Sequence, residues 1–153
     1  MREEAQLRQL ESWVEPLIRN LAPPARRRLA ATIARELRRS QRQRIASQRN
    51  PDGSPFEPRK PQNRNRQGAI RRAAMFTKIR TAKHLRMKGQ QSGAEVGFLG
   101  RIAQIARVHQ YGLRDRVQRG GPTYQYPARQ LLGYTEGDIR LIRDELINHL
   151  TPE

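Results

Sequence analysis

The amino-acid sequence predicts an α+β fold: a small antiparallel sheet of hairpins packed by N-terminal and C-terminal helices, with an extended basic loop. Three observations lead to this class. Apolar residues recur at helical spacing towards both ends of the 153-residue chain. Two stretches with hairpin signals lie between these ends. A proline-rich, basic stretch without helical periodicity separates the first helices from the hairpins.

Apolar residues at three- and four-residue steps predict an amphipathic helix over residues 3–20. Pro16 lies inside this stretch and is expected to kink or restart the helix. Pro23 and Pro24 suit the first turn of a second helix that runs to about residue 47. This second helix is rich in arginine, and its apolar face carries Leu29, Ile33, Leu37 and Ile45.

Turn chemistry ends the basic helix at Asn50-Pro51-Asp52-Gly53, because proline presets φ and Asp-Gly accepts a tight bend. Residues 54–68 contain three prolines and few apolar side chains, so we expect an extended loop that is mobile or ordered by a partner. A short helix is expected from about Ala69 to Arg80.

Alternating apolar side chains over residues 84–88 and 94–98 predict a β-hairpin. Residues 101–111 have helical spacing, and Gly112 is expected to stop that helix. Gly120-Gly121-Pro122 lies in the middle of residues 114–126 and suggests a second, longer hairpin.

The last helix is expected to begin at Thr135, with Asp138 three residues on as in a capping box. We expect this helix to run to the C-terminus with its apolar residues turned inward, namely Ile139, Ile142, Leu146 and Leu150. Leu131 and Leu132 are expected to pack beneath it. The whole of 1–153 is predicted to be a single domain, with helices over 1–48, an extended arm or loop over 49–68, and an α+β core over 69–153.

The charge is concentrated in one part of the chain. There are 31 basic and 14 acidic residues, a net charge of +17, and residues 26–90 hold 20 of the basic residues and 3 of the acidic ones. Arginine supplies 27 of the 31 positive charges, which a high-GC genome also favours. Because arginine pairs bidentately with carboxylates and phosphates, a polyanion and an acidic protein both fit as partners.

The supply of core residues is small. The chain has 14 Leu, 10 Ile, 4 Val and 3 Phe, about a fifth of its residues, which is near the limit for independent folding of a highly charged chain. Either partners complete a small core, or part of the chain orders on assembly. We therefore expect a marginally stable subunit that association stabilises.

Several function classes have no support. The chain has no cysteine, and His84, His109 and His149 show no metal-binding spacing. No nucleophile-elbow or phosphate-loop motif is present, so we expect no enzyme activity, no catalytic or metal site and no cofactor. No apolar run approaches the ~20 residues that a membrane span needs, so no membrane association is expected.

Three stretches in this order resemble the phage virion morphogenesis family over about residues 5–150. They are QRIASQRNPDGSPF from Gln43 to Phe56 with Arg59-Lys60 behind it; AEVGF from Ala94 leading to IARVHQYG, which ends at Gly112; and YPARQLLGY from Tyr126 to Tyr134 followed by Asp138-Ile139. Phe56 stands where a tryptophan is expected, which preserves an aromatic side chain.

The resemblance implies a structural virion protein of the neck or tail top, one that completes tails and supports head–tail joining. It further implies a small α+β subunit in a homo-oligomeric ring, commonly a hexamer, around the DNA channel. The implied partners are neighbouring tail-tube, terminator and neck proteins, with a contact to DNA in the channel. The expected location is the virion, and the host cytoplasm during assembly.

The resemblance and the turn chemistry together select candidate residues. We expect the stretch from Arg49 to Gln67 to be an assembly arm outside the monomer's core, with Phe56 as an aromatic anchor inside a charged rim. The alternative is a surface loop whose phenylalanine folds back on its own subunit. The candidate assembly interface is Arg49, Asn50, Pro51, Asp52, Gly53, Phe56, Arg59 and Lys60. The candidate structural motif is His109, Gly112, Tyr126, Pro127, Arg129, Leu132 and Gly133.

Two other functions stay open. A basic nucleic-acid-binding protein that contacts phosphates without sequence specificity is the main alternative, and salt-sensitive binding of free DNA or RNA by the isolated chain would favour it. Residues 26–90 offer only two aromatic side chains, so recognition of single strands has little support. A hydrolase would need an assembled site that the sequence does not present.

Overall fold

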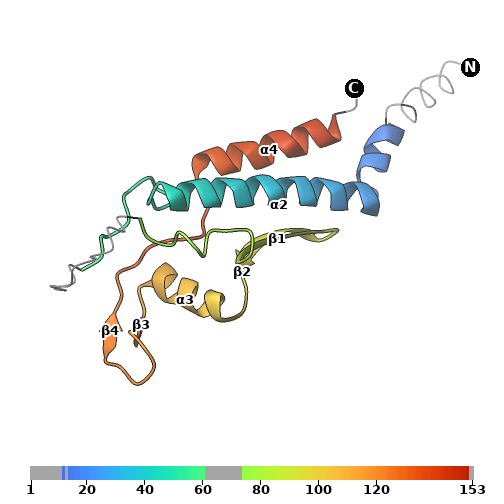
Figure 1. The fold of residues 1–153 in the computed structure, drawn as a ribbon. Coiled ribbons are helices and arrows are strands. Elements are labelled where there is room, and N and C mark those ends of the chain that lie inside the picture. The colour runs from blue at the N-terminus through green and yellow to red at the C-terminus, as the bar shows by residue number, and fades with distance from the viewer. Residues whose placement is uncertain (1–11, 13, 61–73, 152–153) are drawn as a thin grey trace, which may run out of the picture. The chain divides into compact units, whose positions relative to one another are not determined.

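The computed structural model describes residues 12, 14–60 and 74–151 (Figure 1). Residues 14–20 are helical. The elements that follow are α2 (Pro23–Ala46), β1 (Leu85–Gln90), β2 (Gly93–Phe98), α3 (Gly100–Tyr111), β3 (Arg114–Arg116), β4 (Thr123–Gln125) and α4 (Glu136–Leu150). β1 pairs with β2, and β3 pairs with β4, in two separate two-stranded sheets. The α+β class is confirmed, with two hairpins in place of one sheet.

The basic helix α2 forms where its periodicity predicts it. Pro23 opens it, at a position where a missing amide hydrogen costs no helical hydrogen bond. Ile33, Leu37 and Ile45 are buried along one face. The helix ends at Ala46, and the chain reverses through Gln48, which has φ 57°.

Both predicted hairpins and the helix between them are confirmed. A two-residue turn joins β1 to β2, with Leu85 and Phe98 buried. Gly112 adopts the left-handed conformation at φ 61° and ends α3, and the amide of Leu113 donates to the carbonyl of Val108 at 2.9 Å. In the second hairpin, Asp115 lies opposite Tyr124.

The prediction of a short helix from Ala69 to Arg80 is wrong over the part of this range that the structure describes. Residues 74–84 form a series of turns, and residues 61–73 lie outside the described part of the chain. Phe76 has φ 64°, which a helix does not allow. The amide and carbonyl of Met75 both bond to the side chain of Gln48, so a tertiary contact occupies backbone groups that a helix would use.

The chain divides into two compact units. The first comprises the described residues of Met1–Leu37, Met87–Val96 and Glu136–Glu153, and the second comprises Arg38–Arg86 and Gly97–Thr135. The single domain over 1–153 and its three parts stay a prediction.

In the first unit, α4 runs beside α2 (Figure 1). The side-chain amide of Asn20 donates to the carbonyl of His149 at 2.9 Å, and Nε2 of His149 lies 2.6 Å from the carbonyl oxygen of Asn20. On the hairpin, Gly89 lies so close to the backbone of Ala31 that a Cβ at position 89 would overlap it. A glycine is required there because the hairpin backbone lies against α2.

The expected orientation of the last helix is wrong for three of its four apolar residues. Ile139, Leu146 and Leu150 are 48%, 42% and 38% exposed, and Ile142 is half-buried. The side of α4 that packs carries buried Asp138 together with half-buried Leu141, Ile142 and His149. The paired bonds between Asn20 and His149 fix this rotation, because at 100° per residue the three exposed apolar residues then lie on a neighbouring face.

The second unit has a core of its own. Ile45 from α2, Leu85 from β1 and Leu131 from the loop before α4 are its largest fully buried side chains. Phe56, Met75, Ala106 and Val108 are buried in the same unit. Across the described residues, no helix is both long enough and apolar enough to span a membrane.

Candidate assembly site

The turn segment, defined here as Arg49–Lys60, begins with the predicted tight turn. The amide of Asn50 donates a hydrogen bond to the carbonyl of Ser54 at 2.8 Å, and the amide of Gly53 donates one to the carbonyl of Asn50 at 2.9 Å. Gly53 has φ 88°, which explains the glycine. Oδ1 of Asp52 accepts bonds from the hydroxyl and the amide of Ser54, which lower the pKa of Asp52. The turn is therefore preformed within the subunit.

The turn segment is joined to residues 126–133, which hold the later part of the candidate structural motif. Oδ1 of Asn50 accepts from the amide of Gln130 at 2.9 Å. The ring of Pro51 lies against Gly133, where a Cβ would come within 2.5 Å of Pro51 Cγ. Two segments about 80 residues apart in sequence therefore form one local structure.

Arg44 holds the end of α2 to the same segment. Its Nη1 donates to the carbonyls of Arg49 and Gln130, both at 2.8 Å, and its Nη2 donates to the carbonyl of Leu131 at 2.8 Å. Gln41 accepts from Nη2 at 2.6 Å and donates to the carbonyl of Gly133 at 2.6 Å. Both side chains are buried, so this part of the arginine-rich helix faces the interior.

Arg129 connects three segments. It is 4% exposed, and its Nε and Nη2 donate to the carbonyls of Glu57 at 2.6 Å and Pro58 at 3.1 Å. Its Nη1 lies 3.3 Å from Nδ1 of His109, and its amide donates to the carbonyl of His109 at 2.7 Å. Burial lowers the pKa of Arg129. The geometry orients Arg129 towards carbonyl oxygens, which hold the turn segment in place.

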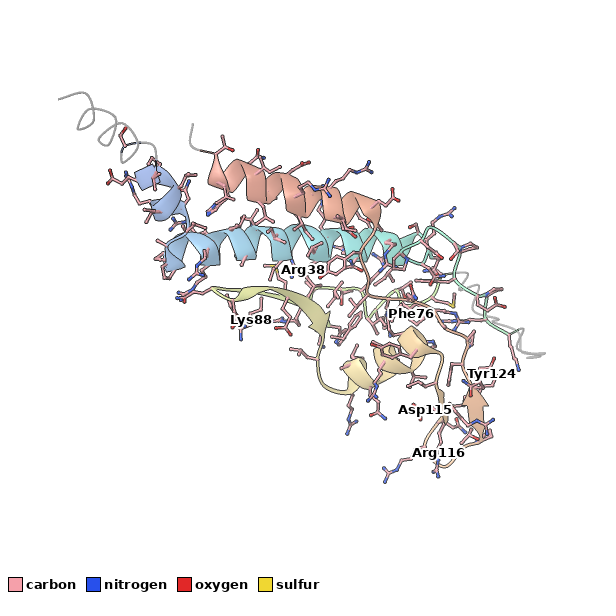
Figure 2. All side chains as sticks on the ribbon, turned by 180° about the vertical axis from the view of Figure 1, so that it is seen from behind. Arg38, Phe76, Lys88, Asp115, Arg116 and Tyr124 are labelled. Atoms are coloured by element: carbon pink, nitrogen blue, oxygen red, sulfur yellow. The ribbon has the colours of Figure 1, made fainter. Side chains whose placement is uncertain are left out.

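Five rings, which we call the ring cluster, pack edge to face beside Arg129. The centroid distances are 5.8 Å from Phe56 to Phe76, 4.8 Å from Phe76 to His109, 5.0 Å from His109 to Tyr126, and 4.9 Å from Tyr126 to Tyr124. Figure 2 labels Phe76 and Tyr124. The cluster therefore connects the turn segment, the turns after residue 74, α3 and β4.

Charges border the ring cluster. Burial, and then the positive charges of Arg129 and Arg59, lower the pKa of His109 to about 4, so its imidazole is neutral near pH 7. Nζ of Lys60 lies 4.5 Å from the centroid of the Tyr124 ring, a cation–π contact. The neutral imidazole can accept a hydrogen bond from Arg129 at Nδ1.

The expectation that Phe56 extends from the subunit as an anchor is wrong. The ring is 5% exposed and packs on Phe76 in its own chain. A bond of 2.7 Å from the amide of Phe56 to the carbonyl of Gln48 fixes the backbone. The physical reason is that the turn precedes Phe56 and Arg129 holds the carbonyls of Glu57 and Pro58 behind it, so the backbone directs the ring inward. Residues 61–67 of the expected arm lie outside the described residues.

Comparison with known sequences identifies the family. The sequence pattern of the phage virion morphogenesis family matches residues 5–151. The chain belongs to this family. It is 37% identical over 147 residues to Tail completion protein S of Escherichia phage P2, which covers 95% of this chain and 97% of that protein. No solved structure matches this one.

In this member of the phage virion morphogenesis family, all three stretches behind the resemblance contribute residues to the second unit, namely Gln43–Phe56, Ile105–Gly112 and Tyr126–Tyr134. His109 and Arg129 are in contact, and the amide and carbonyl of Leu132 pair with the side chain of Gln110 at 2.9 and 2.8 Å. Gly112 allows close approach of Ala128, since a Cβ there would lie 2.9 Å from the Ala128 amide nitrogen. Pro127 is half-buried beside these residues.

Four polar residues and two aromatic residues of the site were not selected from the sequence: Gln41, Arg44, Gln48, Gln110, Phe76 and Tyr124. Three of them are glutamines, and glutamine carries no positional signal at these places. Arg44 lies on the buried face of α2, three residues after Gln41 and one before Ile45. Its place in the helical periodicity could therefore have indicated that it is buried. Among the described residues, no group of three or more His, Cys, Asp or Glu could hold a metal ion.

Proposed function

We propose that this protein is a structural tail completion protein, which assembles at the head-proximal end of a phage tail. One observation carries the proposal: the 37% identity to Tail completion protein S of Escherichia phage P2, spread over 95% of this chain and 97% of that protein. Because the match runs over nearly the whole of both chains, it includes the turn segment and residues 126–133. A shared role is the simplest inference.

The chemistry of the site supports a structural role without catalysis. Arg44 and Arg129 direct their donors to backbone carbonyls, so both guanidinium groups serve to hold segments together. The neutral His109 lies within the ring cluster. We therefore propose that the protein works through its surfaces, without a cofactor.

We infer that association covers apolar side chains that the isolated subunit leaves exposed. Ile139, Leu146, Ile147 and Leu150 leave an exposed apolar stripe on α4, and Ile18 and Leu21 are more than half exposed in the same unit. Exposed apolar residues grouped in this way are typical of an interface. We propose a homo-oligomeric ring, with a hexamer as the expected form, that contacts neighbouring tail and neck proteins and supports head–tail joining.

The turn segment contributes its polar side to this proposed interface. Arg49, Asp52, Arg59 and Lys60 are exposed, while Phe56 is buried and supports them from within. A preformed turn with charges of both signs can recognise a partner without losing much conformational entropy on binding. Phe56 thus contributes to the proposed interface indirectly, because its buried ring supports the exposed charged residues.

The experiment is a complementation test in a phage from which this gene is deleted. Without the gene we expect filled heads and free tails to accumulate apart, and the gene supplied from a plasmid should restore joined virions by electron microscopy. Antibody against the protein should label the head-proximal end of tails. Normal virions from the deleted phage, or label elsewhere on the virion, would overturn the proposal. Sedimentation of the purified chain gives the number of subunits in the ring.

A further inference from the structure

The outward face of α2 carries a row of arginines. Arg28, Arg35, Arg39 and Arg42, which we call the arginine row, are exposed. Their steps of seven, four and three residues place them on one side of an α-helix. The buried residues Ile33 and Leu37 lie on the opposite side of the same uninterrupted helix.

This arrangement opposes the stability of the helix. Arg35 and Arg38 are three residues apart and Arg38 and Arg42 four apart, so like charges are neighbours. The first turn of α2 has no acidic residue, whereas Arg26, Arg27 and Arg28 follow closely behind Pro23, near the positive end of the helix dipole. Glu36 is the single acidic residue of the 24-residue helix. An external anion would relieve this repulsion.

The kind of anion follows from what the face lacks. No large apolar side chain of α2 is exposed, in contrast with α4, where four are. A protein partner normally needs an apolar centre within a polar rim, and the arginine row has none. A polyanion needs only evenly placed cations, and arginine binds phosphate oxygens in a bidentate manner.

The length of the row suits a nucleic-acid backbone. From Arg28 to Arg42 the helix rises about 21 Å, at 1.5 Å per residue. Double-stranded DNA presents roughly six phosphates of each strand over that length. Four guanidinium groups along it can meet phosphates without reading any base.

We propose that the arginine row binds the phosphate backbone of double-stranded DNA without sequence preference. This rests on the proposed function in one respect, because head–tail joining brings the subunit to the path of the genome. Binding itself is a property of the folded chain and does not require the virion. It can therefore be measured on the purified protein.

The test uses a fluorescent 30-base-pair duplex of arbitrary sequence, titrated with the full chain at several salt concentrations. We expect the logarithm of the binding constant to fall by roughly 3 to 4 units per tenfold rise in salt, near 0.9 for each phosphate contacted. The variant Arg28→Gln/Arg35→Gln/Arg42→Gln should bind at least about tenfold more weakly and lose nearly three units of that slope. Glutamine keeps the helix propensity, so circular dichroism should be unchanged.

A matched control removes three exposed arginines elsewhere, Arg101, Arg107 and Arg140, with the same change of net charge. It should keep the slope within about one unit, and lysine at the three α2 positions should keep it as well. Equal loss by both triple variants would overturn the proposal, since binding would then follow total charge. So would a wild-type chain that does not bind the duplex, or poly-glutamate that competes as well as DNA of equal charge.

The two proposals fail separately. A wild-type gene that does not complement the deleted phage counts against the proposed function, whatever the duplex titration shows. A flat titration beside normal complementation counts against the arginine row alone.

Discussion

Nε of Arg129 donates to the backbone carbonyl of Glu57 at 2.6 Å, across 72 residues of sequence. With Nη2 on the carbonyl of Pro58 and Nη1 near His109, one guanidinium holds the turn segment against α3 and the ring cluster. A buried arginine that donates to carbonyl oxygens of a distant segment acts as a cross-link, because a hydrogen bond from a charged donor contributes more to stability than a neutral one.

Arg129→Ala should therefore lower the free energy of unfolding by about 3 kcal/mol, since it leaves the carbonyls of Glu57 and Pro58 without a donor. Urea denaturation followed by circular dichroism measures the change. Arg119→Ala, at an exposed position in the second hairpin, is the control and should stay within about 0.5 kcal/mol of the wild type. Similar values for the two variants would mean that water replaces the guanidinium.

Phe56→Ala tests the inward position of that ring. Because Phe56 packs on Phe76 and is buried, truncation should cost about 3 to 5 kcal/mol and weaken the fold of the subunit itself. Thermal unfolding and sedimentation of the same sample separate folding from assembly. Tyr134→Ala, at 64% exposure, should leave the unfolding midpoint nearly unchanged. A folded Phe56→Ala monomer that fails only in assembly would restore the anchor interpretation.

The lowered pKa of His109 predicts that the stability of the protein decreases in acid. Its folded-state pKa is about 4 against an ordinary 6.5, chiefly through burial, so the unfolded chain binds the proton more tightly. The stability that neutral His109 contributes is complete above pH 6.5 and falls as the pH drops towards 4. His109→Gln should flatten the dependence of unfolding free energy on pH between 4.5 and 7.5. A steep slope in the His109 variant would assign the effect to other groups.

Thr135 occupies the N-cap position of α4, which begins at Glu136. Thr135→Ala should destabilise the protein by about 1 kcal/mol, because an N-cap oxygen satisfies a first-turn amide. Thr135→Ser should retain most of the stability, and Thr77→Ala at an exposed turn is the control. If alanine at 135 costs nothing in urea denaturation, the hydroxyl has no capping role.

The apolar stripe of α4 predicts stability that depends on association. The thermal midpoint of the wild-type chain should rise with protein concentration, since burial of this stripe between subunits favours the folded state. Leu146→Glu should abolish that dependence and yield a folded monomer by sedimentation. Asn148→Glu, exposed on the same helix with the same charge added, should still associate. A midpoint independent of concentration in the wild type would exclude a role for the stripe in stability.

Much of the local structure follows from the sequence alone, because the signals are local. The periodicity of α2, the stop at Gly112, the turn at Asn50–Gly53 and the two hairpins need only helix spacing, a left-handed glycine and turn chemistry. The family could also be recognised from the sequence, because the order and spacing of the motif residues are properties of the sequence itself. The charge pattern of α2 was likewise readable.

Tertiary contacts decided what those signals leave open. A helical wheel gives α4 an apolar stripe but does not say which side packs, and the bonds between Asn20 and His149 turn that stripe outward. The hydrophobicity of Phe56 indicates that its ring is buried, but not whether its own subunit covers it; Phe76 of the same chain packs against it. In the same way, Gln48 takes the backbone groups of Met75, where local propensity had predicted a helix. Each case depends on a partner distant in sequence, which no local pattern contains.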